Sequence, residues 1–308
     1  MTSVIRGRAA SERQTQFDVV FYNDRGGLSS FRDMDNINVR IVREDRAISF
    51  LKYLVTRVDY EEINILSSPK IANALAEDDG LAITYEFHSS NMTVIENEMS
   101  VLDFDRLSSI LVPSVMMQEK VADLLPRRVR RRLFVCPNLV DHGLFSPQGV
   151  SDFFAHDETL SSAGLKPLVW VGRFDRDKGY QYAIRALAQL PTNYVGVFVV
   201  SLEHDPLRAN RFFSECDAMG VRDRVLLYMN LSQPDMANLY RSARDAGGAY
   251  LSTSLMESFG YSIAESLSCG LSCVSFDLPV LDMHEGRGNL HRVPIGDVQS
   301  FADAVRTL

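Results

Sequence analysis

Two glutamates, Glu257 and Glu265, stand on either side of a turn that is suited to binding an anion. Gly260 lies between them and leaves the backbone room for the close approach of a ligand. From Tyr261 on, the spacing of apolar residues predicts a helix, so the turn offers free N–H groups and the positive end of a helix dipole. Carboxylates around such a helix start suit a ligand with a phosphate in its middle and hydroxyls at both ends, such as a nucleotide sugar. The alternative is two solvated acids on an ordinary helix.

This stretch resembles the signature of the retaining GT-B glycosyltransferases of family 4 (glycosyl transferases group 1). The resemblance rests on Glu-x7-Glu, with Phe259 and Gly260 after the first acid and Ser254 in Ser-x-x-Glu before it. In that family the first Glu faces the donor sugar and the second binds the nucleotide ribose. The resemblance therefore implies that Glu257 holds the sugar, that Glu265 holds the ribose, and that the Phe-Gly amides contact the diphosphate.

A second motif of the family is a diphosphate clamp, and its residues follow a predicted apolar strand. The strand ends in Gly172 and Arg173, and Lys178 stands at the start of the next predicted helix. Two fixed cations suit the negative charge that builds up on a leaving nucleoside diphosphate. The alternative is a salt-bridged surface loop. An Asp-x-Asp sequence inside the loop mimics a metal motif, but its context is that of the cation loop, so we predict no metal site.

The first half of the chain holds further candidates at strand ends, where open α/β sheets bind their ligands. Gly26 and Gly27 follow a predicted strand over Phe17–Tyr22, and His88 ends a later one. By themselves, a Gly-Gly pair is more often a simple turn and a lone His is more often structural. In the family a glycine-rich loop after the first strand lines the cleft, and a functional His faces the donor sugar. The resemblance thus implies diphosphate contacts for the two glycines and a catalytic role for His88 beside Glu257.

The chain departs from the family pattern at several positions. Met229 and Asn230 stand where the family has Gly in the loop that borders the base pocket, so the donor base, in UDP, GDP or another nucleotide, stays open. Leu139 replaces a Gly of the interdomain segment. The sequence ends at Leu308, before the family's last helices, the final one of which crosses back to the first domain, which leaves open a compact variant or a missing part.

Predicted strands and helices alternate along the whole sequence, which is typical of a doubly wound α/β protein. A chain of 308 residues can form two separate cores. Together with the resemblance, this predicts a GT-B fold of two Rossmann-like domains facing across a cleft. We expect a disordered lead at 1–16, an acceptor-side domain at 17–148 that includes the start of the linker, and a nucleotide-sugar domain at 149–308.

Composition and charge restrict the function classes further. The net charge of −8 argues against a general nucleic-acid-binding protein. No apolar run approaches the ~18 residues of a membrane span, and the start lacks the apolar core of a secretory signal. The four cysteines show no metal-ligand spacing, which predicts reduced thiols and a cytoplasmic protein.

One basic segment stands out on this acidic chain, and it contains Arg127, Arg128, Arg130, Arg131 and Arg132. It is either a solvated helix end or an electrostatic contact with anionic lipid on the inner face of a membrane. A lipid-linked or phosphorylated acceptor would suit the second interpretation.

The resemblance implies the transfer of a sugar from a nucleotide sugar to an acceptor hydroxyl, with retention of configuration and without a metal or other cofactor. The acceptor is a sugar, a lipid-linked molecule or another small molecule. The sequence shows no obvious nucleophile, which favours front-face attack within an ion pair. The alternative function is a non-catalytic, glycosyltransferase-like binding or scaffold subunit. A Rossmann oxidoreductase is disfavoured because no strand is followed by Gly-x-Gly-x-x-Gly.

Overall fold

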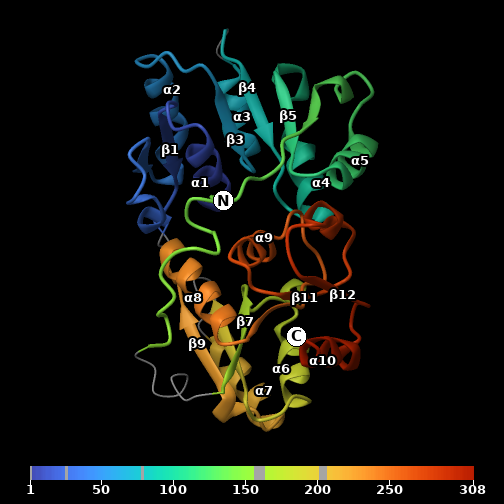
Figure 1. The fold of residues 1–308 in the computed structure, drawn as a ribbon. Coiled ribbons are helices and arrows are strands. Elements are labelled where there is room, and N and C mark those ends of the chain that lie inside the picture. The colour runs from blue at the N-terminus through green and yellow to red at the C-terminus, as the bar shows by residue number, and fades with distance from the viewer. Residues whose placement is uncertain (1, 25–26, 78–79, 156–163, 201–206) are drawn as a thin grey trace. The chain divides into compact units, whose positions relative to one another are not determined.

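The computed structural model describes residues 2–24, 27–77, 80–155, 164–200 and 207–308. The chain forms two compact units. The N-terminal unit is Glu12–Leu139, and the C-terminal unit combines Met1–Ser11 with Val140–Leu308. The chain therefore passes between the units twice, after Ser11 and after Leu139 (Figure 1).

The N-terminal unit is built from parallel strands that alternate with helices. Its strands are β1 (Phe17–Phe21), β2 (Ile37–Ile41), β3 (Ile63–Leu66), β4 (Ile83–Glu86), β5 (Ser109–Val112) and β6 (Leu133–Val135). Its helices are α2 (Glu44–Val55), α3 (Pro69–Leu75), α4 (Met92–Val101) and α5 (Val115–Leu124). β1 pairs with β2, and the other strands form a sheet in the order β3-β4-β5-β6, with every pair parallel. β4 is buried along its whole length, as expected of a central parallel strand.

The C-terminal unit contains one parallel sheet of six strands, in the order β12-β11-β10-β7-β8-β9. The strands are β7 (Lys166–Val171), β8 (Tyr194–Val200), β9 (Val225–Met229), β10 (Ala249–Ser252), β11 (Cys273–Phe276) and β12 (Leu290–Val293). Its helices are α1 (Thr2–Ser11), α6 (Tyr180–Ala188), α7 (Leu207–Ala218), α8 (Gln233–Asp245), α9 (Tyr261–Ser268) and α10 (Val298–Arg306). The chain moves outward from β7 to β9 and then returns to the other side of β7 as β10. The strand order thus reverses between β7 and β10.

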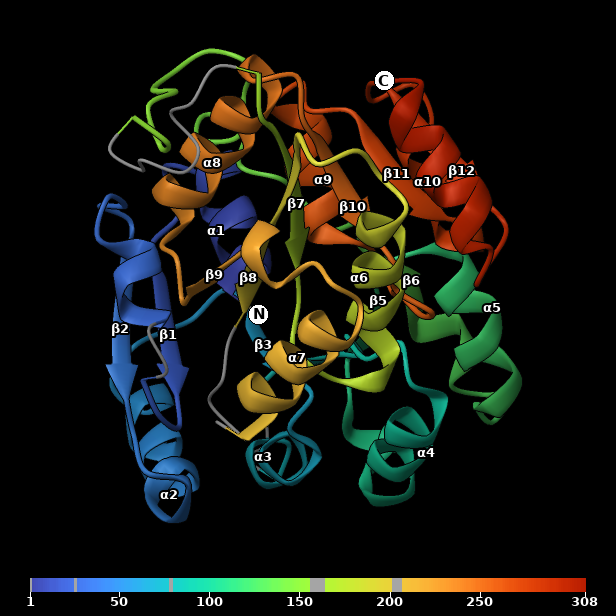
Figure 2. The ribbon, with the colours of Figure 1, turned by 90° about the horizontal axis from the view of Figure 1, so that it is seen from below.

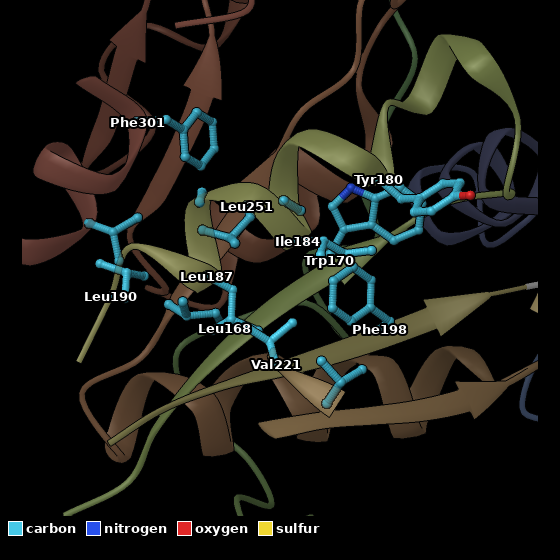
Figure 3. Close-up of a cluster of buried hydrophobic side chains, with 14 of the residues drawn as sticks. Leu168, Trp170, Tyr180, Ile184, Leu187, Leu190, Phe198, Val221, Leu251 and Phe301 are labelled. Carbon is cyan, nitrogen blue, oxygen red and sulfur yellow. The ribbon is translucent and has the colours of Figure 1, made fainter. Parts of the chain in front are cut away.

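The core of the C-terminal unit lies between this sheet and the helices α6, α7 and α10 (Figure 2). Figure 3 shows Trp170 of β7 and Phe198 of β8 together with Tyr180 and Ile184 of α6. The rings of Trp170 and Phe198 lie 5.6 Å apart. Aromatic side chains bury large apolar areas, so this cluster packs the carboxyl end of β7 against α6. Helices α8 and α9 pack on the sheet through β7, β10 and β11.

The N-terminal segment differs from the predicted disordered lead, because its residues 2–11 form the helix α1. Its contacts explain the difference. Val4 and Ala9 are buried, and the buried Arg6 pairs through Nε with Oδ2 of Asp141 at 2.9 Å. These partners lie far away in the sequence, so the local pattern gave no sign of them.

The boundary between the units also falls earlier than the predicted one at 148/149. Residues 140–148 belong to the C-terminal unit, because Phe145 is buried against the ring of Tyr240. The Arg241 guanidinium adds hydrogen bonds to the carbonyls of Leu144 and Ser146, at 3.2 and 3.4 Å. None of the helices in the described ranges is long and apolar enough to span a bilayer.

Candidate functional site

The candidate site lies where the loops after β7 and β10 leave the sheet. The two strands are direct neighbours, with Leu168 opposite Ala249 and Val169 opposite Tyr250. They flank the point at which the strand order reverses. In open α/β sheets this point, at the carboxyl ends of the strands, is where ligands bind. The topology therefore brings together the two predicted donor motifs.

Two glycines allow close contacts here, Gly172 within the loop after β7 and Gly179 between that loop and the one after β10. A Cβ on Gly172 would lie 2.8 Å from the Trp170 ring and 3.2 Å from Cγ of Lys178. Gly179 has a φ of +59°, and a Cβ there would lie 2.4 Å from the carbonyl oxygen of Thr253. Only glycine fits such a left-handed position at so short a distance from backbone. Any larger residue at Gly179 would force the two loops apart.

Asp175 organises the cation loop. Its Oδ1 accepts the backbone N–H of Lys178 at 3.0 Å, which caps the short 3-10 helix η4 (Arg176–Lys178). Its Oδ2 pairs with Nη2 of Arg173 at 3.1 Å, while the Arg173 side chain stays 64% exposed. Asp175, the first aspartate of the Asp-x-Asp sequence, therefore caps η4 and forms an ion pair with Arg173. Sequence reasoning missed this role, although an aspartate three residues before Lys178 is a recognisable N-cap signal.

Thr253 joins the two loops from the other side. Its hydroxyl accepts the indole N–H of Trp170 at 2.9 Å and donates to the carbonyl of Lys178 at 3.2 Å. Two residues after Thr253, a backbone hydrogen bond also joins the loops, from Leu255 N–H to the Asp177 carbonyl at 2.7 Å. Local sequence does not predict this connection, because a threonine after a strand has many structural uses.

This connection brings Lys178, a predicted cation of the diphosphate clamp, next to Glu257, the predicted sugar-binding acid. Lys178 Nζ lies 2.5 Å from Oε1 of Glu257, and the two side chains are 24% and 11% exposed. Ser254 Oγ donates to the same carboxylate oxygen at 2.8 Å. Two charges that are largely removed from solvent interact more strongly at this distance than the same charges in water. A phosphate that binds Lys178 must therefore compete with Glu257.

The loop after β10 ends at Gly260, which begins α9 in a left-handed conformation with a φ of +80°. The Gly260 carbonyl accepts the N–H groups of Ile263 and Ala264. Within the described parts of the chain, no acceptor is recorded for the N–H of Gly260. The neighbouring Phe259 side chain is buried. This turn therefore places the positive end of the α9 dipole three residues after Glu257.

Glu265 lies on α9 and is only 6% exposed. Burial raises its pKa to about 8, and the hydrogen bond from Ser3 opposes that rise. Ser3 Oγ of α1 donates to Oε1 of Glu265 at 3.2 Å. Glu265, the residue predicted to bind the ribose, is therefore covered by the first helix of the chain, a contact that the sequence did not indicate.

The other predicted site residues lie elsewhere. His88 follows the carboxyl end of β4, and its Nε2 lies 2.9 Å from Oε2 of the buried Glu86. Gly27 begins a 3-10 helix, η1 (Gly27–Phe31), and Gly26 lies outside the described residues. Both segments belong to the N-terminal unit.

The predicted base-pocket residues stand at the end of β9, two strands from β7 in the same sheet. The Met229 side chain is 56% exposed, and Asn230 has a φ of +52°. No finding tests their contact with a base, so this assignment stays a prediction.

A hollow of about 640 Å³ lies in the N-terminal unit, after the carboxyl ends of β1 and β2. It is lined by Tyr22, Asn23, Arg43, Glu44 and Asp45. The Arg43 guanidinium pairs with both oxygens of Asp45, at 3.0 and 2.9 Å. The lining therefore offers a hydroxyl, an amide, a cation and two carboxylates.

Comparison with known proteins identifies the family of this chain. The family model of the glycosyl transferases group 1 matches residues 153–308, which is half of the chain and includes the loops after β7 and β10. The chain belongs to this family. It is also 30% identical over 148 residues to the D-inositol 3-phosphate glycosyltransferase of Xylanimonas cellulosilytica. That match covers 47% of this chain and 34% of the relative, so the chain matches about a third of the relative's length.

Solved structures show the fold of the whole chain. Anabaena HepE, in complex with UDP and glucose, has a TM-score of 0.78 at 18% identity, with 99% of this chain and 85% of that chain covered. The sucrose-phosphate synthase of Thermosynechococcus elongatus has a TM-score of 0.66 at 22% identity, covering 87% and 71%. These likenesses confirm the predicted GT-B fold class with Rossmann-like α/β units.

Proposed function

We propose that this protein transfers a sugar from a nucleotide-sugar donor to an acceptor hydroxyl, with retention of configuration and without a metal. The observation that carries the proposal is the meeting of Lys178 and Glu257 at the reversal point of the sheet. A scaffold without ligand chemistry has no need of a shielded cation and acid beside a helix start. Membership of the glycosyl transferases group 1 and likeness to a UDP-bound structure support the donor class.

In this proposal the positively charged groups bind the diphosphate, and the carboxylates bind the sugar and the ribose. Lys178, Arg173 and the Gly260 N–H would stabilise the diphosphate as the bond from the sugar breaks, because all three offer positive charge where negative charge develops. Glu257 would hold the sugar, whose ring becomes positive in the transition state, and by resemblance His88 does so too. Glu265 would bind the ribose hydroxyls once Ser3 has given up its hydrogen bond.

On the acceptor side, the hollow beside β1 and β2 fits a polyhydroxylated molecule. Carboxylates such as Glu44 accept hydroxyl hydrogens, and the Tyr22 hydroxyl and Asn23 amide can donate and accept. The basic segment 127–132 would bring the protein to an anionic membrane that carries a lipid-linked acceptor.

A binding experiment with matched variants tests the donor proposal. Thermal shift with UDP, GDP, ADP and their sugars should show one nucleotide series that raises Tm, because a ligand at 100 times its Kd adds about 2.7 kcal/mol. Lys178→Ala should lose this shift, and Lys120→Ala, an exposed lysine of α5, should keep it. No shift with any nucleotide would contradict the proposal. Binding without turnover on any acceptor would favour the non-catalytic alternative, and turnover abolished by EDTA and restored by Mg²⁺ would contradict the absence of a metal.

A further inference from the structure

His284 is a fully buried histidine that none of the assigned roles uses. It ends the 3-10 helix η6 (Pro279–His284), which follows β11. Its Nε2 lies 2.5 Å from the carbonyl oxygen of Phe259, and its ring packs edge-on against the Phe259 ring, with centroids 5.0 Å apart. The contact thus reaches the loop between β10 and α9, immediately before Gly260.

The chemistry of the contact fixes the state of the ring. A carbonyl oxygen only accepts hydrogen bonds, so Nε2 must carry a proton and donate it. Burial lowers the pKa of His284, which favours the neutral ring and leaves Nδ1 without a proton. Among the described residues, Nδ1 is buried and has no hydrogen-bond partner.

An unpartnered buried nitrogen makes histidine a costly choice at this position. A buried polar atom without a partner destabilises a fold, whereas a phenyl ring would pack against Phe259 without that cost. What histidine supplies and phenylalanine lacks is the Nε2 donor. Departures from the most stable choice are expected where a residue serves function.

The donor controls the direction of a neighbouring N–H group. The Phe259 carbonyl and the Gly260 N–H belong to one peptide unit, and the described chain contains no cis peptide. In a planar trans peptide these two groups point to opposite sides. A carbonyl held toward His284 therefore turns the Gly260 N–H away from His284, and no described atom accepts it.

Glycine makes this control necessary. Gly260 can adopt backbone angles of either sign at little cost, so its own conformation does not fix the peptide plane. The hydrogen bond from His284 does, since a reversed peptide would leave both the Nε2 donor and the buried carbonyl without partners.

We propose that His284 is a positioning residue that aims the Gly260 N–H at the donor diphosphate. The proposal rests on the proposed function, because it assumes that the turn before α9 receives the diphosphate. It makes a specific demand: loss of the Nε2 donor should weaken binding of the diphosphate while leaving binding of the nucleoside unchanged.

The test compares three variants by calorimetric titration with UDP, GDP and ADP and with the corresponding nucleosides. His284→Gln places an amide N–H at the same number of bonds from Cβ as Nε2. His284→Phe keeps the ring and removes the donor, and His284→Asn keeps an amide that is too short to reach Phe259. We expect wild-type affinities in the Gln variant. In the Phe and Asn variants we expect about tenfold weaker nucleoside diphosphate binding, or about 1.4 kcal/mol, with nucleoside affinity unchanged.

Other outcomes overturn the proposal and differ from one another. Wild-type affinity in the Phe and Asn variants would mean that the carbonyl needs no donor. Equal losses for nucleoside and diphosphate, or a Gln variant as weak as Phe, would indicate a packing role only. If the Phe variant does not fold, the comparison of Gln with Asn decides. If wild type binds none of the nucleotides, the proposed function fails as well.

Discussion

Lys178 and Glu257 neutralise each other in the structure, and this changes what each substitution should do. If Glu257 is removed, Lys178 no longer has to break an ion pair before it binds a phosphate. If Lys178 is removed, Glu257 keeps only the hydrogen bond from Ser254 among the described residues. A charge that is buried and loses its partner is strongly destabilised. Although the two residues form one pair, their removal should therefore have opposite effects. Loss of Glu257 should leave diphosphate binding intact, whereas loss of Lys178 should weaken diphosphate binding and destabilise the Glu257 charge.

We expect Glu257→Gln to bind nucleoside diphosphate at least as tightly as wild type and to lose about tenfold or more in kcat, or about 1.4 kcal/mol of barrier. The reason is that the sugar ring gains positive charge only in the transition state, so the lost interaction lowers kcat rather than donor affinity. Titration with nucleoside diphosphate and steady-state kinetics measure the two effects. Turnover at the wild-type rate would show that Glu257 has another role.

Glu265 predicts a pH dependence of stability. Burial raises its pKa from 4.5 to about 8, so between these values the folded protein keeps a proton that the unfolded chain has lost. This contribution is fully present below the unfolded pKa and is lost as the pH rises through the folded pKa. Glu265→Gln stays neutral throughout. Its Tm relative to wild type should therefore rise between about pH 5 and about pH 8, and scanning calorimetry at both values checks this. A constant difference would contradict the raised pKa.

At this scale the sequence pointed to candidate residues but not to their partners. Gly172, Lys178 and Glu257 were singled out by their resemblance to family motifs, which consist of local features: a strand, a turn and a helix start. The link through Thr253 and the cover of Glu265 by Ser3 depend on side chains far apart in sequence. No periodicity records such contacts, and only the folded chain shows them.

Helix α1 is the element whose attachment is easiest to test. Arg6 and Asp141 are 4% and 8% exposed and form an ion pair at 2.9 Å. Removing one partner leaves the other charge buried, so Arg6→Met should lower the free energy of unfolding by about 3 kcal/mol or more. The double variant with Asp141→Asn should recover part of that loss. Urea unfolding of both variants measures the difference.

A matched control comes from an exposed pair on α7. The Arg211 side chain is 75% exposed and lies 3.0 Å from Glu215. Because solvent screens such pairs, Arg211→Met should cost at most about 0.5 kcal/mol. Equal losses for Arg6→Met and Arg211→Met would mean that α1 is not anchored through its ion pair.

The elements of the sheets were easier to predict than α1. Parallel strands covered on both faces are apolar throughout, and the apolar strand predicted before Gly172 is observed as β7. α1 has almost no apolar stripe, and its buried residues include Arg6 and Gly7. Its helical state depends on tertiary contacts, which a local pattern does not contain.

At the scale of the whole molecule, the structure divides the basic segment into two groups. Three of its arginines have partners in the N-terminal unit: Arg128 pairs with Asp105, Arg130 donates to the Leu125 carbonyl, and Arg132 donates to the carbonyls of Phe104, Asp105 and Leu107. Arg127 and Arg131 are exposed. On a chain with a net charge of −8, these two are the best candidates for a contact with anionic lipid.

The proposed membrane contact can therefore be separated from stability. Each arginine near an anionic surface contributes about 1 kcal/mol. Arg127→Gln with Arg131→Gln should thus weaken binding to phosphatidylserine liposomes at low salt by about 30-fold without a change in Tm. Arg132→Gln, which removes three carbonyl contacts, should lower Tm and leave liposome binding of the folded protein within about threefold. Co-sedimentation and calorimetry measure the two effects. If wild type does not sediment with anionic liposomes, or if the Arg127 and Arg131 pair changes only Tm, the segment is a solvated face and the acceptor must reach the protein without it.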